Sequence, residues 1–233
     1  MTLKRNKEKN LYKNFLNIFL GIITSFFSIG ISVIATLNLT IVYRFAITKL
    51  NLDKLTGLSE ENLMKNYNEM IKYLNNPFIN ELKFPDFTMS KTGEIHFMEV
   101  KYIFMKIYII ILISIIIFML FKLIKMLYNA INVVKILNYA SNMIISIFGF
   151  IIIMMLIDFK KAFIVFHKIF FNNNYWLFDP YTDPIINALP EELFLAYALI
   201  IVGILAVQVI AFKVVYYLDK KHNDELVPFN TQI

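Results

Sequence analysis

The sequence predicts an all-α membrane protein, a bundle of four transmembrane helices with two extracytoplasmic loops. Composition is the first reason: 58% of the 233 residues are hydrophobic and only 17% are charged, whereas soluble chains carry roughly a quarter of charged residues. The second reason is that four apolar runs approach or exceed the ~20 residues that cross the hydrocarbon core of a bilayer. A single membrane domain, residues 1–233, accommodates all of these runs.

The apolar runs are the basis for placing the spans, which we expect at about residues 16–42, 102–121, 136–157 and 193–218. The first run follows a basic segment, as in a signal peptide. It is, however, much longer than a signal-peptide core of roughly 7–15 residues and lacks a small-x-small cleavage motif. We therefore expect an uncleaved span. Pro190, followed by two acidic residues, predicts the start of the fourth helix.

The distribution of lysine predicts the orientation. The N-terminal tail, the 122–135 connection and the start of the tail 219–233 carry lysines beside the span ends, whereas the loops 44–101 and 158–192 hold about as many acidic as basic residues. Basic residues beside spans stay in the cytoplasm. Both termini are therefore expected in the cytoplasm of a multi-pass plasma-membrane protein, with both loops and any active site at the extracytoplasmic face.

The first loop, residues 44–101, is expected to hold an amphipathic helix and short extended segments. Ser59 can cap the helix start, and the acidic residues after it suit the positive end of the helix dipole. Apolar side chains then recur at helical spacing, at Leu63, Tyr67, Met70, Ile71 and Leu74. Pro77 ends the helix, and residues 78–95 lack a helical period, which favours extended segments and turns.

The second loop, residues 158–192, is rich in aromatic and polar side chains. It contains His167, an asparagine triplet and the only tryptophan, Trp176. Tyrosine and tryptophan rings suit a membrane–water boundary, where an apolar body and a polar tip are both satisfied. We therefore expect a structured element at the membrane surface, and part of any chemistry there.

Two of the three histidines, His96 and His167, fall on the predicted outer side, where the topology lets them approach each other. Ionisable groups at membrane depth are costly and are candidates for function, and imidazole exchanges protons near neutral pH. The alternative for each is an interfacial histidine bonded to a carbonyl or to water. His222, beside Lys220 and Lys221 in the predicted cytoplasmic tail, is expected to be solvated.

Several classes of function can be weighed from the motifs. His96 and Glu99 share a helix face, and His167 could complete a metal site, but the chain has no Cys and no HExxH motif. We expect no metal and no cofactor. A serine elbow or Walker loop is missing, as is a basic stripe with stacking aromatics that would bind nucleic acid. A histidine enzyme, a metal-dependent membrane hydrolase and a non-enzymatic membrane accessory protein stay open.

Two blocks of the sequence resemble the bacterial lipoprotein intramolecular transacylase (Lit) family, and the resemblance covers nearly the whole chain. The first block consists of Phe166-His167, Phe170, Asn172, Trp176-Leu177, Asp179-Pro180, Asp183 and Leu189-Pro190-Glu191. The second consists of Tyr67, Tyr73-Leu74, Glu94, His96, Met98 and Glu99-Val100-Lys101. The family pattern has methionine after the second block's histidine and aspartate three residues after it. This chain has Phe97 and Glu99 at those positions, so the carboxylate is kept.

The resemblance implies an acyltransferase that acts within one substrate. It would move the sn-2 acyl chain of a diacylglyceryl-Cys lipoprotein to the α-amine of that cysteine, giving a lyso-form lipoprotein. The partners would be diacylglyceryl-modified lipoproteins and membrane lipid, with no nucleic acid and no obligate protein partner. Such aminolysis needs a base for an α-ammonium of pKa about 8, a stabilised oxyanion and an acid for the alkoxide, but no enzyme nucleophile.

The resemblance also suggests site residues. His167 and His96 would be catalytic, His167 as the base and His96 as its proton-passing or oxyanion-stabilising partner; the reverse order and a covalent acyl-imidazole stay open. Candidates to orient the imidazoles or bind substrate are Glu99, Asn172, Trp176, Asp179, Asp183, Tyr67 and Arg44. As alternatives, the two aspartates and Asn172 cap turns, Trp176 belongs to an interfacial belt and Arg44 is an ordinary interfacial arginine.

Overall fold

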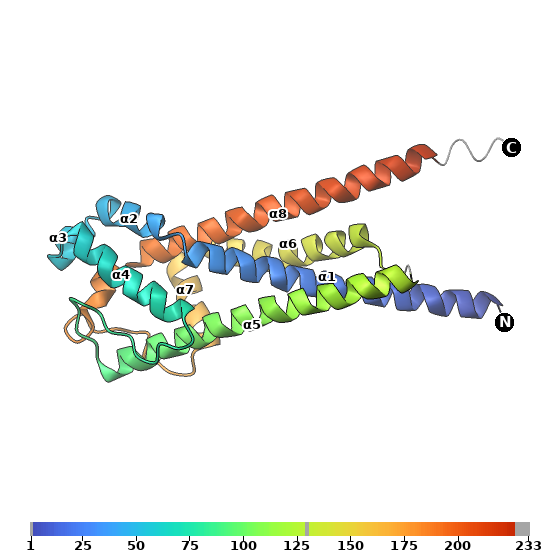
Figure 1. The fold of residues 1–233 in the computed structure, drawn as a ribbon. Coiled ribbons are helices and arrows are strands. Elements are labelled where there is room, and N and C mark those ends of the chain that lie inside the picture. The colour runs from blue at the N-terminus through green and yellow to red at the C-terminus, as the bar shows by residue number, and fades with distance from the viewer. Residues whose placement is uncertain (1, 129–130, 227–233) are drawn as a thin grey trace. The chain divides into compact units, whose positions relative to one another are not determined.

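Helices are the only regular secondary structure in the part of the chain that the structure, a computed structural model, describes: residues 2–128 and 131–226. The long helices are α1 (Thr2–Leu37), α5 (Lys91–Tyr128), α6 (Val133–Ile157) and α8 (Glu191–Leu226). The shorter ones are α2 (Thr40–Lys49), α3 (Leu52–Thr56), α4 (Glu60–Asn75), α7 (Phe159–Phe170) and the 3₁₀ helix η1 (Pro184–Ala188) (Figure 1).

Four of the described helices are long and apolar enough to cross a membrane, over Asn10–Leu37, Lys91–Leu123, Val133–Ile157 and Glu191–Asp224. The predicted all-α fold with four spans is therefore confirmed. Several bounds differ from the predicted spans: the first helix ends at Leu37 rather than near residue 42, α5 begins at Lys91 rather than near residue 102, and α8 continues to Leu226, past residue 218. The last residues of the predicted cytoplasmic tail, 227–233, lie outside the described part.

The chain divides into two compact units. The first comprises Met1–Ser32, Ile110–Phe150 and Val202–Ile233, and the second Val33–Ile109 and Ile151–Ile201. In the first unit, α1 and α6 approach closely at Gly21, where an added Cβ would lie 2.6 Å from Tyr139 Cβ. Small residues permit such close helix packing in membranes, where dispersion replaces the hydrophobic effect as the driving force.

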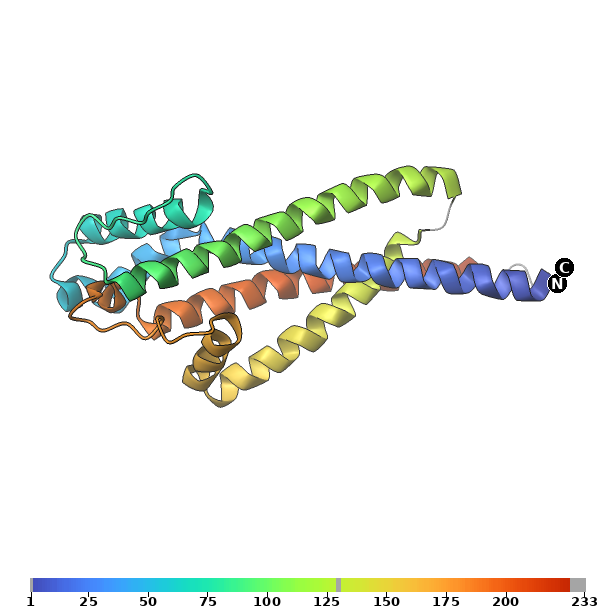
Figure 2. The same ribbon diagram turned by 90° about the horizontal axis from the view of Figure 1, so that it is seen from below.

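In the second unit, α4 is the predicted amphipathic helix. Ser59 caps it as expected, its Oγ accepting from the backbone N–H of Asn62 at 3.2 Å. The expected apolar side chains form its buried face, Leu63, Tyr67, Met70, Ile71 and Leu74. In two perpendicular views, α2, α3 and α4 lie beside the N-terminal ends of α5 and α8 (Figure 1, Figure 2), and their apolar side chains share one core with Phe97 and Leu193.

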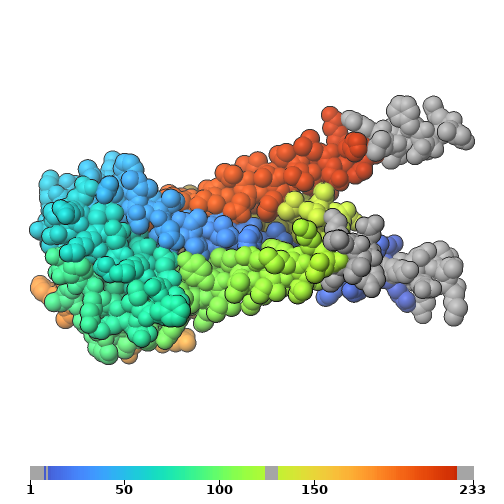
Figure 3. Space-filling model, viewed as in Figure 1, coloured from blue at the N-terminus to red at the C-terminus, as the bar shows by residue number. Residues whose placement is uncertain are grey.

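The segment between α4 and α5 contains no strand and is irregular over residues 79–90. Two sets of polar contacts hold it in place. The Asn66 side chain donates to Asp86 Oδ2 at 2.6 Å and accepts from the Asp86 backbone N–H at 3.1 Å. Lys101 donates to the carbonyl of Ile79 and lies 4.5 Å from the centre of the Tyr73 ring. With α4, the segment forms the continuous teal and green surface seen in Figure 3.

Candidate functional site

His96 and His167 approach each other inside the second unit. His96 lies near the start of α5 and His167 near the end of α7, and their ring centres are 6.1 Å apart with the planes inclined by 32°. Their exposed fractions are only 7% and 9%. No hydrogen bond joins the two rings in the described structure. Their separation leaves both imidazoles within reach of one bound group, which fits the expectation that they approach each other.

Local capping explains why both histidines are positioned on helices. Asp158 begins α7, its Oδ1 accepting from the backbone N–H of Lys161 at 3.0 Å. Asp183 holds the start of α5, its Oδ1 accepting from the backbone N–H of Ser90 at 2.7 Å. Asp183 is 2% exposed, and its other carboxylate oxygen accepts from the Thr182 hydroxyl at 2.8 Å. This aspartate therefore supports the helix that carries His96, through bonds to Ser90 and Thr182.

Aromatic rings surround both imidazoles. Trp176 stacks on His167 with ring centres 4.6 Å apart and planes inclined by 29°, and Phe163 lies 4.2 Å from the same imidazole. Phe171 and Phe178 lie 4.8 and 5.4 Å from His96. We call these four rings, Phe163, Phe171, Trp176 and Phe178, the aromatic cage. Trp176 is thus a wall of the site, 9% exposed, and not part of an exposed belt.

A backbone contact determines the tautomer of His167. Its Nδ1 lies 2.8 Å from the carbonyl oxygen of Phe163. A carbonyl can only accept, so Nδ1 carries the proton and Nε2 keeps a lone pair that can take one. Burial lowers the pKa of His167 below its ordinary value, because a buried imidazolium loses solvation; the bond to Phe163 opposes this shift. The geometry therefore favours a neutral imidazole that can act as a base.

Asn173, which the sequence did not single out, connects the two histidine-bearing elements. Its Nδ2 donates to Glu99 Oε1 at 2.8 Å, and its backbone carbonyl accepts from Trp176 Nε1 at 3.1 Å. Glu99 lies one turn after His96 on α5, while Trp176 stacks on His167. The neighbouring Asn172 is exposed. The sequence has three consecutive asparagines here, and it does not indicate which of their side chains turns inward.

The other sequence candidates lie in different surroundings. Asp179 is exposed and forms a turn, accepting from the backbone N–H of Tyr181 at 3.0 Å. Tyr67 is buried, with its hydroxyl 2.6 Å from that of Tyr197 and its ring stacked on Tyr43 at 4.0 Å. Burial raises the pKa of Tyr67, so this phenol stays protonated. Both side chains are thus bonded to other groups of the protein.

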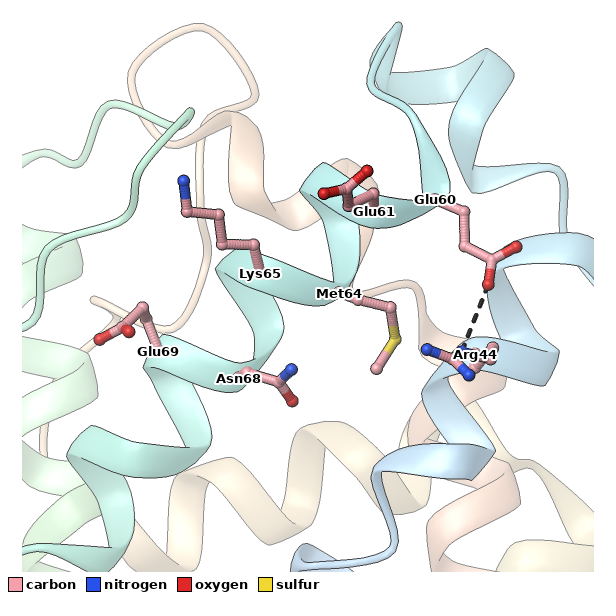
Figure 4. A pocket seen from close by; sticks show the side chains of 7 residues that line it. All are labelled: Arg44, Glu60, Glu61, Met64, Lys65, Asn68 and Glu69. Carbon is pink, nitrogen blue, oxygen red and sulfur yellow. Dashed lines mark ion pairs between the residues drawn. The ribbon is translucent and has the colours of Figure 1, made fainter.

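Arg44 lies apart from the histidines, in a surface cleft of about 680 Å³ between α2 and α4. It pairs with Glu60 at 3.3 Å (Figure 4), and both side chains are more than half exposed. Exposed ion pairs of this kind contribute little to stability. The cleft is open to the surface, is lined also by Glu61, Met64, Lys65, Asn68 and Glu69, and does not include either imidazole.

A metal site is not formed by the described residues. Within residues 2–128 and 131–226, no group of three His, Asp or Glu side chains could hold a metal ion. The arrangement of His96, Glu99 and His167 considered from the sequence therefore does not make a three-ligand site among the described residues.

Four apolar helices and a buried pair of imidazoles define a multi-pass membrane protein with a two-histidine site. A model of the family described as "Lipoprotein intramolecular transacylase Lit" matches residues 18–194, and the chain belongs to this family. It is therefore an acyltransferase. The comparison with curated proteins gives no significant match.

Solved structures of the membrane-integral lipoprotein intramolecular transacylase Lit from Bacillus cereus are similar to this chain throughout. One has a TM-score of 0.81 and 31% identity, and the match covers 92% of this chain and 99% of the relative. A variant of that protein with a histidine replaced by arginine has a TM-score of 0.77 and 31% identity, and the match covers 95% of this chain and 99% of the variant. A variant with alanine in place of a histidine has a TM-score of 0.75 and 30% identity, and the match covers 96% of this chain and 99% of the variant.

Proposed function

We propose that the chain moves the sn-2 acyl chain of a diacylglyceryl-Cys lipoprotein to the α-amine of the same cysteine, at the extracytoplasmic face of the cell membrane. The observation that carries the proposal is the pair of buried imidazoles 6.1 Å apart, one of them with a free Nε2 lone pair. Family membership supports the reaction class, and lipoproteins are what the Bacillus cereus relative is named for.

The chemistry follows from the two rings. His167 Nε2 takes a proton from the substrate ammonium, and the resulting amine attacks the ester carbonyl of the sn-2 chain. The tetrahedral intermediate collapses as the ester C–O bond breaks, and His96 delivers a proton to the departing glyceryl oxygen. The amide replaces the ester, the second proton of the nitrogen replaces the one that His96 gave up, and the proton taken by His167 is the one released overall. Enzymes gain most in such steps from preorganised donors and acceptors.

The substrate supplies its own nucleophile, so this reaction needs no serine or cysteine from the protein. The contribution of the site is to hold the amine and the ester together. Proximity of well-oriented groups in one molecule is worth about 7–11 kcal/mol of activation barrier. The chain contains no Cys, which this mechanism accommodates. We further propose that both termini lie in the cytoplasm, as the distribution of lysine indicates.

Mass spectrometry of one lipoprotein's N-terminal lipopeptide tests the proposed function. The host would make only diacylglyceryl lipoproteins, with or without this chain. We expect the chain to convert the peptide to an N-acyl, S-monoacylglyceryl form of unchanged total mass, identified by its fragments. An intact diacylglyceryl peptide in cells that contain well-expressed, folded protein would contradict the proposal.

The pH dependence of the rate gives a second prediction. Because His167 must be neutral to accept a proton, the rate falls as the pH falls through the pKa of His167. Burial lowers that pKa below its ordinary 6.5, so we expect the midpoint of the acid limb of kcat/KM to lie below pH 6.5. The rate would be measured in detergent micelles with a synthetic diacylglyceryl lipopeptide. A midpoint above 6.5 would contradict a buried His167 base.

A further inference from the structure

Two buried polar atoms on α5 lack a hydrogen-bond partner among the described residues: His96 Nδ1 and Glu99 Oε2. Leaving such atoms unpaired in a protein interior is costly, and native structures seldom do so without a functional reason. His96 and Glu99 are three residues apart on one helix, so their side chains emerge on the same face. The two unpaired atoms therefore lie on the same face of α5.

The Glu99 carboxylate is held in position from its other side. Oε1 accepts from Asn173 Nδ2 at 2.8 Å, and Asn173 is itself fixed by Trp176 Nε1, which donates to its carbonyl at 3.1 Å. In the described residues Glu99 has no ion pair. Lys101, two residues further along α5, donates its Nζ to the carbonyl of Ile79. Oε2 is thus a positioned, buried acceptor that no described side chain or backbone group satisfies.

A carboxylate oxygen only accepts hydrogen bonds, and an imidazole nitrogen accepts when the proton is on the other nitrogen. A primary ammonium offers three N–H donors and a positive charge, which matches both atoms. We propose that Glu99 Oε2 and His96 Nδ1 form a binding subsite for the substrate's free α-ammonium. This inference rests on the proposed function and adds the group that selects a substrate with an unmodified amine.

The subsite also determines the tautomer of His96. If Nδ1 accepts from the ammonium, Nε2 carries the proton and is the atom available to donate to the ester oxygen. His167 has the opposite arrangement, with Nδ1 protonated and Nε2 free. The two rings thus present one donor and one acceptor to the reacting groups, as the transfer requires.

The test is a comparison of binding with two unreactive probes. Both are diether-glyceryl-Cys lipopeptides, in which an ether replaces the sn-2 ester; one has a free α-amine and the other is N-acetylated. We expect the wild-type protein to bind the free-amine probe about 10-fold or more tightly, as a buried charge-assisted contact implies. Glu99→Gln should remove this preference while leaving the affinity for the N-acetyl probe unchanged.

Two further variants make the comparison decisive. Glu94→Gln is the matched control, since Glu94 is on the same helix but pairs with Lys91 at 2.5 Å, and it should keep the preference. Asn173→Ala frees the carboxylate from its support and should reduce the preference. If both Glu99→Gln and Asn173→Ala keep it, or if Glu94→Gln loses it equally, the subsite is overturned.

The same measurement distinguishes a failure of the proposed subsite from a failure of the proposed function. If the wild-type protein binds both probes equally, the subsite is overturned and acyl transfer on lipoproteins still stands. If it binds neither probe, both proposals fail. Thermal unfolding of each variant, compared with the wild type, identifies any loss of binding that comes from misfolding.

Discussion

Replacing His167 by alanine is expected to lower the rate of acyl transfer by about 10²–10⁴-fold, the usual contribution of a positioned general base. His167→Ala removes the Nε2 lone pair that takes the proton, while the cage residues and the tie between Asn173 and Glu99 stay in place. The single-turnover rate on a synthetic diacylglyceryl lipopeptide is the measurement, with the N-acyl product quantified by mass spectrometry.

Two controls accompany the His167 variant. His222→Ala changes an exposed histidine near the end of α8 and should leave the rate unchanged. His96→Ala should also lower the rate, since His96 is the proposed acid. A His167→Ala protein that is folded and keeps a rate near that of the wild type would remove His167 from the mechanism.

Adding one methyl group at Gly93 is expected to destabilise the protein by about 1–3 kcal/mol, the usual cost of overpacking a tight site. An alanine Cβ there would lie 2.3 Å from Asp183 Oδ1 and 3.1 Å from Met89 Cγ. The same Asp183 oxygen accepts from the Ser90 backbone at the start of α5. Gly93→Ala therefore displaces the carboxylate that supports the helix of His96, and both the Tm and the activity should fall.

Other glycines provide matched controls for the Gly93 variant. Gly149 in α6 and Gly203 in α8 have no atom within 4 Å of an added Cβ. Because alanine favours helix over glycine by about 0.5–1 kcal/mol, Gly149→Ala and Gly203→Ala should leave Tm unchanged or raise it. Gly93→Ala combined with Asp183→Ala should cost less than the sum of the single changes. An unchanged Tm in Gly93→Ala would contradict the packing described.

The fold was predictable because length and hydropathy decide which helices can cross a bilayer. The same argument misplaced the start of α5, since its first turns carry Lys91, Gly93 and Glu94 and do not look like a span. It also missed the break after Leu37, where no Pro or Gly is present; the Asn38 side chain there bonds back to the carbonyl of Ile34 at 2.8 Å. Polar helix turns and side-chain breaks depend on contacts that local composition does not show.

The candidate site was predictable only in part. The topology brought His96 and His167 to one side, and the structure brings the rings together. The direction of a side chain in a turn depends on tertiary contacts, which is why Asn173 rather than Asn172 meets Glu99. Asp183 was a candidate to orient an imidazole, but it holds the backbone at Ser90, a partner 93 positions away in sequence that spacing cannot reveal.

The aromatic cage also bears on what happens to the ester once it is activated. Phenyl rings offer water no strong hydrogen bonds, and the one indole N–H, on Trp176, is already bonded to the Asn173 carbonyl. Water needs about two to four polar partners to stay in such a place. Once the substrate occupies His167 Nε2, His96 Nδ1 and Glu99 Oε2, the cage offers water no further partner, so hydrolysis of the ester to free fatty acid should be rare. Phe178→Ser would supply one such partner beside His96. We expect that variant to release fatty acid alongside the N-acyl product, turning a transferase partly into a lipase.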